Sequence, residues 1–150
     1  MYIRLFVLFL LTTTSTLAQP LAPREMERVF AAFAFDRPVF LTHAGDGTGR
    51  VFVVEQAGVI KVIDPGAGTV RTFLDHSNIV NSSPGAGETG LLGLAFHPDY
   101  AGNGRVFLSY TWGNLVSRVA EMSVSSDPDS VDASTERLLL QLRVQVAEVQ

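Results

Sequence analysis

The chain has 150 residues, with 11 basic and 15 acidic side chains, a formal net charge of −4 and no cysteine. Hydrophobic residues make up 47% of it, which is typical of a globular protein and excludes a disordered or collagen-like one. The acidic excess argues against a nucleic-acid-binding surface, because Lys and Arg hold the phosphate backbone. Without cysteine, the chain has neither disulfides nor a site for lipoprotein acylation.

Residues 1–18 are expected to form a secretory signal peptide. Arg4 supplies the positive start, Leu5–Leu11 the apolar segment, and Thr16–Ala18 a small-x-small cleavage site. The apolar segment is much shorter than the ~20 residues that a membrane-spanning helix needs. We therefore expect cleavage after Ala18, export to the periplasm or the exterior, no stable membrane insertion, and a mature chain of residues 19–150.

The mature chain is expected to be all-β. Residues 24–35 could form a short helix, but we favour a lead into the first strand. After them, runs of β-branched and aromatic residues are separated by turn residues at intervals of about 8–12 residues, as in a sandwich, barrel or propeller. No amphipathic helix lies between the runs, which disfavours a βαβ fold. The predicted strands are Val39–His43, Val51–Glu55, Gly58–Ile63, Val70–Asp75, Leu91–Phe96, Val106–Thr111, Val116–Val124 and Arg137–Leu142.

The last predicted strand and one glycine-rich motif each allow a second interpretation. A strand is expected at Arg137–Leu142, with a helix over Leu138–Val149 as the alternative. The motif "AGDGTGR" at Ala44–Arg50 resembles a phosphate-binding loop. A dinucleotide fingerprint must lead into a helix, whereas a strand follows here. Asp46-Gly47 therefore predicts a hairpin turn.

Three further motifs are interpreted as structural. His97 and Asp99 could be metal ligands, but zinc needs three or four, and we expect His97 to hydrogen-bond its own turn. Trp112 is expected to pack at a strand end rather than to stack on a sugar. Asp127–Ser134 lacks the Gly and Glu of an EF-hand calcium loop, so a solvated acidic turn is expected. No metal ligand is assigned in this chain.

Glu88 is the candidate ligand-binding residue. It lies in "GETG", directly before the apolar run "LLGLAF" at Leu91–Phe96. A Glu in such a loop is ordinarily a solvated carboxylate. Because the run is apolar on both faces, however, it predicts a central strand, and Glu88 stands at its entry. Strand ends near the axis of a β architecture are places where ligands bind.

Several segments together resemble a known family. They are "LTHAGDGTGRVFVVEQAGVIKVI", "FLD", "GETGLLGLAFHPDYAGNGRVFLSYT" and "SVSSDPDSVDASTERLLLQL". In this order they resemble the glucose/sorbosone dehydrogenase family, the soluble aldose sugar dehydrogenases that depend on pyrroloquinoline quinone (PQQ), over Val39–Leu142. The resemblance implies a six-bladed β-propeller. The chain is expected to supply about two blades, as an N-terminal fragment.

The resemblance also implies a reaction: hydride transfer from the anomeric carbon of an aldose to the quinone, giving a lactone. In the family a histidine acts as general base and calcium polarises the quinone. Glu88 corresponds to a residue that lines the sugar and cofactor site, so it is expected to bind substrate. The acceptor that reoxidises the quinone is not indicated.

The chain departs from the family pattern in one respect. The catalytic histidine motif is expected after "ERLLLQL", where the chain reads "RVQVAEVQ". His43, His76 and His97 do not occupy that position, so no catalytic residue is expected here, the quinone-binding residues are unknown, and the chain alone is expected to be inactive. The alternative is a non-catalytic extracellular β-propeller that binds a protein or a glycan.

Overall fold

The computed structural model describes residues 25, 27–82 and 88–143. The chain divides into two units, residues 1–31 and 32–150. In the first unit, residues 29–31 form a turn, so the alternative of a helix at this point is wrong. The predicted signal peptide lies outside the described residues. No helix among the described residues is long and apolar enough to cross a membrane.

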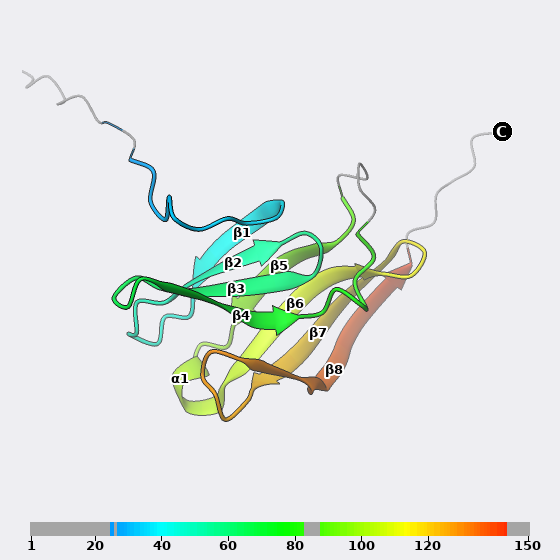
Figure 1. Cartoon of the computed structure of the whole chain (residues 1–150). Coiled ribbons are helices and arrows are strands. Elements are labelled where there is room, and N and C mark those ends of the chain that lie inside the picture. The colour runs from blue at the N-terminus through cyan, green and yellow to red at the C-terminus, as the bar shows by residue number, and fades with distance from the viewer. Residues whose placement is uncertain (1–24, 26, 83–87, 144–150) are drawn as a thin grey trace, which may run out of the picture. The chain divides into compact units, whose positions relative to one another are not determined.

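The second unit contains two antiparallel four-stranded sheets (Figure 1). In each sheet the strands follow one another in chain order, so hairpins connect all neighbours. The first sheet contains β1 (Pro38–His43), β2 (Val51–Glu55), β3 (Val59–Asp64) and β4 (Thr69–Asp75). The second contains β5 (Leu91–Phe96), β6 (Arg105–Trp112), β7 (Val116–Val124) and β8 (Val131–Arg143), with the short helix α1 (Tyr100–Asn103) between β5 and β6. The all-β prediction and its eight strands are confirmed.

The two sheets pack face to face, with β5 against β1 and β2, and β8 against β4 (Figure 1). Alternation along the strands directs one set of side chains into this interface. Phe52 on β2 lies at its centre, with ring-centroid distances of 4.8 Å to Phe73 on β4 and 4.7 Å to Phe96 on β5. Tyr100 on α1 extends the cluster, 4.8 Å from Phe96. Aromatic side chains from both sheets therefore share one core.

β5 is an edge strand of its sheet, so the prediction of a central strand is wrong. Leu91 and Leu94 face the core, whereas Leu92 is 40% exposed. A shift of register between Leu91 and Gly93 changes the alternation of sides. An apolar run indicates that both faces of the strand can be buried. It does not indicate whether the strand pairs with one neighbouring strand or with two.

The last strand, β8, is longer than the predicted strand Arg137–Leu142. β8 begins at Val131, because Val131 pairs with Val124 and Asp132 with Ser123. The turn expected over Asp127–Ser134 is therefore confined to the residues before Val131. β8 continues to Arg143, so the helix alternative is wrong up to that residue, and the remainder lies outside the described residues.

Phe52→Ala should lower the free energy of unfolding by about 3–5 kcal/mol, because it removes a fully buried ring and leaves a cavity between the sheets. Phe40 on β1 provides the control, since its side chain is 43% exposed and Phe40→Ala should cost much less. Urea unfolding of the three proteins gives the comparison. Equal losses in both variants would show that the inter-sheet core does not depend on Phe52.

Candidate functional site

Glu88 lies at one end of the paired sheets, just before β5. Its side chain is exposed and lines a cavity of about 240 Å³ together with Thr89, Thr111, Leu115 and Ser117, here called the Glu88 cavity. Thr111 is near the end of β6, and Ser117 is directly opposite it on β7. The hairpin between β6 and β7 supplies Leu115. The lining thus combines one carboxylate, three hydroxyl-bearing side chains and one aliphatic side chain.

Gln56, just after β2, holds the segment that carries Glu88. Its side-chain amide Nε2 donates a hydrogen bond to the carbonyl oxygen of Thr89 at 2.8 Å. Its own carbonyl oxygen accepts one from the backbone N–H of Leu91 at 2.9 Å. Arg37 in turn donates to Oε1 of Gln56 at 3.2 Å, and its carbonyl oxygen accepts from the N–H of Gln56 at 3.0 Å. The first sheet therefore fixes the backbone on both sides of Gly90.

Gly90 is required at this junction for two reasons. Its φ of 126° lies in a region that other residues rarely adopt. A Cβ at this position would lie 2.7 Å from Cγ of Gln56 and closer still to its carbonyl oxygen. From the other side, the N–H of Thr111 donates to the carbonyl oxygen of Gly90 at 2.9 Å. One of the glycines around Glu88 thus permits a close contact between two backbone segments.

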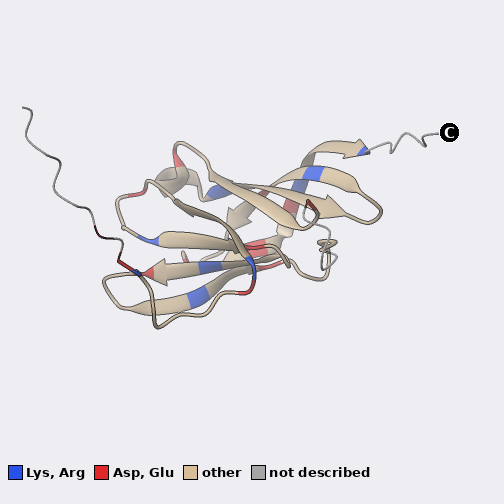
Figure 2. Cartoon of the chain, turned by 90° about the horizontal axis from the view of Figure 1, so that it is seen from above, with Lys and Arg blue, Asp and Glu red and all other residues tan. Residues whose placement is uncertain are grey.

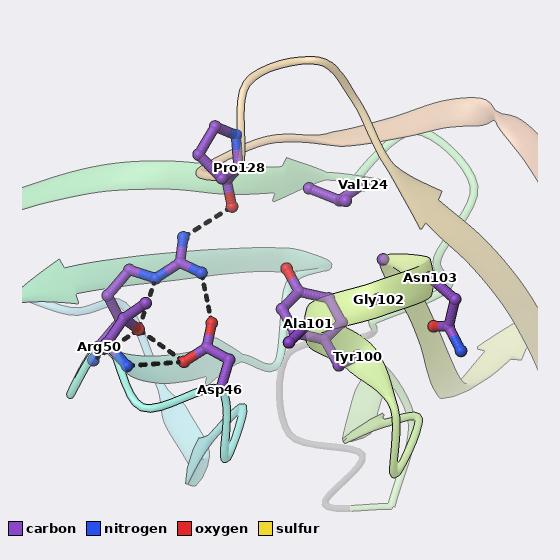
Figure 3. Close-up of a pocket in the computed structure, with 10 residues that line it drawn as sticks. Asp46, Arg50, Tyr100, Ala101, Gly102, Asn103, Val124 and Pro128 are labelled. Carbon is purple, nitrogen blue, oxygen red and sulfur yellow. Dashed lines mark hydrogen bonds and ion pairs between the residues drawn. The ribbon is translucent and has the colours of Figure 1, made fainter.

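A second cavity, of about 460 Å³, lies between the β1–β2 loop, α1 and the β7–β8 turn (Figure 3). Arg50 makes most of the polar contacts at this cavity. Its Nη2 contacts Oδ2 of Asp46 at 2.7 Å, and its Nε donates a hydrogen bond to Oγ1 of Thr48 at 3.0 Å. Nη1 reaches the β7–β8 turn, where it contacts Oδ1 of Asp129 at 2.6 Å and the carbonyl oxygen of Pro128 at 2.7 Å. The motif at Ala44–Arg50 is therefore a turn, as predicted, and its arginine joins the two sheets.

Arg71 on β4 extends this group of charges. It contacts Asp127 at 2.6 Å and Asp129 at 3.0 Å. We call Asp46, Arg50, Arg71, Asp127 and Asp129 the Arg50 cluster. Hydrogen bonding to Arg71 lowers the pKa of Asp127. Burial opposes ionisation of Asp46, but hydrogen bonds from Thr48 and Arg50 outweigh it, so the pKa of Asp46 is also lowered.

The Tyr100 side chain borders the same cavity (Figure 3). Its hydroxyl is buried near Arg50 and has no hydrogen-bond partner of good geometry among the described residues. Burial raises the pKa of Tyr100. Arg50 is the only cation among the described lining residues, and its hydrogen bonds already go to oxygens of the chain. The polar groups of the cavity stabilise the fold.

None of the three histidines lines the Glu88 cavity. His97 accepts hydrogen bonds at Nδ1 from the N–H of Asp99 at 3.0 Å and contacts the Asn103 amide at 2.8 Å, which confirms that it hydrogen-bonds its turn. His76 is buried between the sheets, 3.7 Å from Oε2 of Glu136. The Tyr110 hydroxyl donates to the same carboxylate, and burial together with this bond raises the pKa of Tyr110 to about 12.

Trp112 lies at the end of β6, as predicted, and is 39% exposed. The guanidinium carbon of Arg118 lies 3.6 Å from the centroid of its ring, a close cation–π contact. Trp112 thus packs against a cation, and it does not line the Glu88 cavity. Basic and acidic side chains lie interspersed over the described strands and loops (Figure 2).

A family model described as Glucose / Sorbosone dehydrogenase matches residues 35–146. The chain belongs to this family. Quinoprotein glucose dehydrogenase B of Acinetobacter calcoaceticus is 31% identical over 121 residues, which are 75% of this chain and 25% of that protein. The mouse hedgehog-interacting protein is 38% identical over 118 residues, which are 71% of this chain and 17% of that protein.

Solved structures of the family show the same fold. The PQQ-bound aldose sugar dehydrogenase of Streptomyces coelicolor superimposes with a TM-score of 0.58 at 23% identity, covering 72% of this chain and 31% of that one. The apo aldose sugar dehydrogenase of Escherichia coli gives 0.58 at 24% identity, covering 71% and 30%. The two sheets therefore correspond to part of a β-propeller, and the chain spans a third or less of the length of these relatives.

The residues described here do not by themselves fit the quinone or calcium. Calcium takes six to eight oxygen ligands, and no group of three or more Asp, Glu or His among the described residues could hold a metal ion. Among the residues that the structure describes, none that lines the Glu88 cavity is a Lys or Arg that could pair with the carboxylates of PQQ. What the cavity offers is acceptors and hydroxyls for a neutral polar ligand.

Gly90→Ala should destabilise the protein by about 1–3 kcal/mol, because it combines an unfavourable φ with a clash against Gln56. Gly93→Ala is the matched control on the same strand, since its Cβ would lie at an ordinary 3.6 Å from Cβ of Ser109. Thermal unfolding of both variants provides the measurement. A Gly90→Ala protein as stable as Gly93→Ala would contradict the close contact.

The Arg50 cluster should make the free energy of unfolding decrease as the pH falls into the acid range. The pKa of Asp46 is lowered on folding from its ordinary 3.8, so its contribution is present above that pH and lost as the pH falls through the lower, folded-state value. Asp46→Asn should be less stable than the original protein at neutral pH and should lose less on acidification. Urea unfolding over a pH series measures this, with Asp36→Asn as control, because the Asp36 side chain is 72% exposed. Parallel curves for the original protein and Asp46→Asn would refute the effect.

Proposed function

We propose that the whole protein oxidises an aldose to its lactone in a PQQ-dependent reaction, and that this chain contributes Glu88 to the sugar site. The observation that carries the proposal is the Glu88 cavity in a chain of the glucose/sorbosone dehydrogenase family. In the whole protein PQQ would serve as the electron acceptor, and calcium would act as a Lewis acid beside it. Both are proposed from the family alone.

The chain's own part in this proposal is to bind and orient the sugar. The Glu88 carboxylate accepts hydrogen bonds from sugar hydroxyls, and Ser117 and Thr111 can donate or accept at neighbouring positions. Gln56 keeps the backbone of Glu88 in place through Thr89 and Leu91. Orientation matters because only a sugar held in reactive geometry gains the full rate advantage of proximity.

We also propose export, with residues 1–18 as a signal peptide and residues 19–150 as part of the mature propeller. The support is the pattern of Arg4, Leu5–Leu11 and Ala18. An extracytoplasmic location suits a protein that meets free sugars.

A second candidate function is the binding of a partner protein. The observation that favours it is the 38% identity to the hedgehog-interacting protein, which exceeds the 31% identity to quinoprotein glucose dehydrogenase B. Fold alone does not decide between the two, because one scaffold can carry unrelated functions. The two proposals differ in what they require of Glu88, since only the first places a sugar hydroxyl against its carboxylate.

Glu88→Ala in the whole protein should lower kcat/KM for aldose oxidation roughly tenfold to a hundredfold, because a hydrogen bond to a charged group contributes ~1.5–3 kcal/mol. Glu88→Gln should be milder, since it keeps an acceptor oxygen. Both should fold normally, because the Glu88 side chain is exposed. Dye reduction with added PQQ and calcium, alongside a thermal melt, gives the measurement.

The control is Glu27→Ala, which removes another exposed carboxylate and should leave the kinetics unchanged. Unchanged kcat/KM in Glu88→Ala would remove Glu88 from the site. A protein without aldose oxidation, but with saturable binding to a partner protein that survives Glu88→Ala, would establish the second function instead.

A further inference from the structure

Leu115, in the hairpin between β6 and β7, has a backbone conformation that its residue type does not favour. Its φ is 54°, in the left-handed region that Gly and Asn adopt readily and a bulky side chain does not. In the turn Gly113–Leu115, Gly113 also adopts this conformation, with a φ of 51°, but only for the leucine is it unfavourable. Such local strain persists only where the surrounding structure or a function offsets it.

Packing within the fold does not account for Leu115. Its side chain is 43% exposed and does not belong to the core between the sheets. It lies instead on the wall of the Glu88 cavity. A strained, exposed aliphatic residue beside a carboxylate is a feature of ligand sites, where an apolar surface must face the ligand.

The rest of the cavity defines what this surface would contact. Thr111 and Ser117 are directly opposite each other across the β6–β7 ladder, and both line the cavity with Glu88. A pyranose ring presents hydroxyls around its edge and C–H groups on its faces. The hydroxyls match Glu88, Thr111 and Ser117, and the C–H groups match Leu115.

Charge and volume restrict the ligand further. Glu88 is the only charged residue of the cavity lining within the part of the chain that the structure describes, so an anionic sugar acid would be repelled. The volume of about 240 Å³ lies below the roughly 300–1,000 Å³ of pockets for drug-sized ligands. The space that these described residues bound is of the size of one sugar ring.

We propose that Leu115 determines the size of the substrate: its side chain closes the Glu88 cavity behind a single neutral aldose ring and so disfavours disaccharides. This inference rests on the proposed sugar oxidation and adds to it a residue that discriminates between substrates. The aliphatic side chain of Leu115 can neither donate nor accept a proton, so its effect falls on binding.

Leu115→Gly separates this role from a structural one. Glycine adopts a φ of 54° without strain, so the variant should melt at the same temperature as the original protein or higher. The Leu115→Gly variant also removes the aliphatic side chain that lines the Glu88 cavity. The ratio of kcat/KM for glucose to that for maltose should fall about tenfold, within the range that a few apolar atoms in a pocket provide, and mainly through KM.

Leu115→Asn and Asn114→Ala complete the experiment. Asparagine also tolerates the left-handed conformation but replaces the apolar wall with an amide, so it should lose affinity for glucose. Asn114 belongs to the same turn but not to the cavity lining, so Asn114→Ala should leave the ratio unchanged. Titration calorimetry with glucose and maltose, on the whole protein without dye, provides a readout independent of turnover.

Two results would overturn the proposal, and they are distinguishable. If the original protein binds and oxidises glucose but Leu115→Gly keeps the original preference for glucose over maltose, Leu115 has no role in selection, while the proposed function stands. If the original protein neither binds nor oxidises any aldose, the proposed function fails and this inference fails with it.

Discussion

The close contact between Gly90 and Gln56 is the constraint on which the candidate site depends. It brings the end of β2 and the start of β5 within hydrogen-bonding distance, and bonds on both sides of Gly90 fix the backbone there. Only a residue without a Cβ permits this approach. The backbone position of Glu88, two residues before Gly90, depends on this contact, while the aromatic core around Phe52 holds the faces of the sheets together.

The strands were predictable from the sequence because their signals are local. Alternating β-branched and aromatic residues with turn residues between them fixed the positions of β1 to β7 to within about two residues. The start of β8 was missed, because Val131 and Asp132 are strand residues through their pairing with β7 and not through their own propensity. The edge position of β5 was missed for the same reason, since the number of neighbours of a strand is a property of the sheet.

The candidate site was predictable only in part. Glu88 could be selected by its place before an apolar strand and by a family resemblance. Gln56 could not, because its contacts to Thr89 and Leu91 join residues more than thirty positions apart, and nothing in "VEQAG" distinguishes it. Leu115 could not either, because a leucine next to "GN" gives no sign that it takes the left-handed conformation as well as Gly113.

The two ends of the sheet pair are held by different means. At one end, ionic contacts of the Arg50 cluster join the β1–β2 loop to the β7–β8 turn. At the other, neutral hydrogen bonds centred on Gln56 join β2 to β5. The β6–β7 hairpin carries Leu115 but takes no part in the Arg50 cluster. The tip of the hairpin can therefore be lengthened, shortened or exchanged while the Arg50 cluster keeps the two sheets together. This makes the hairpin a suitable place for sequence divergence and for the introduction of a new specificity.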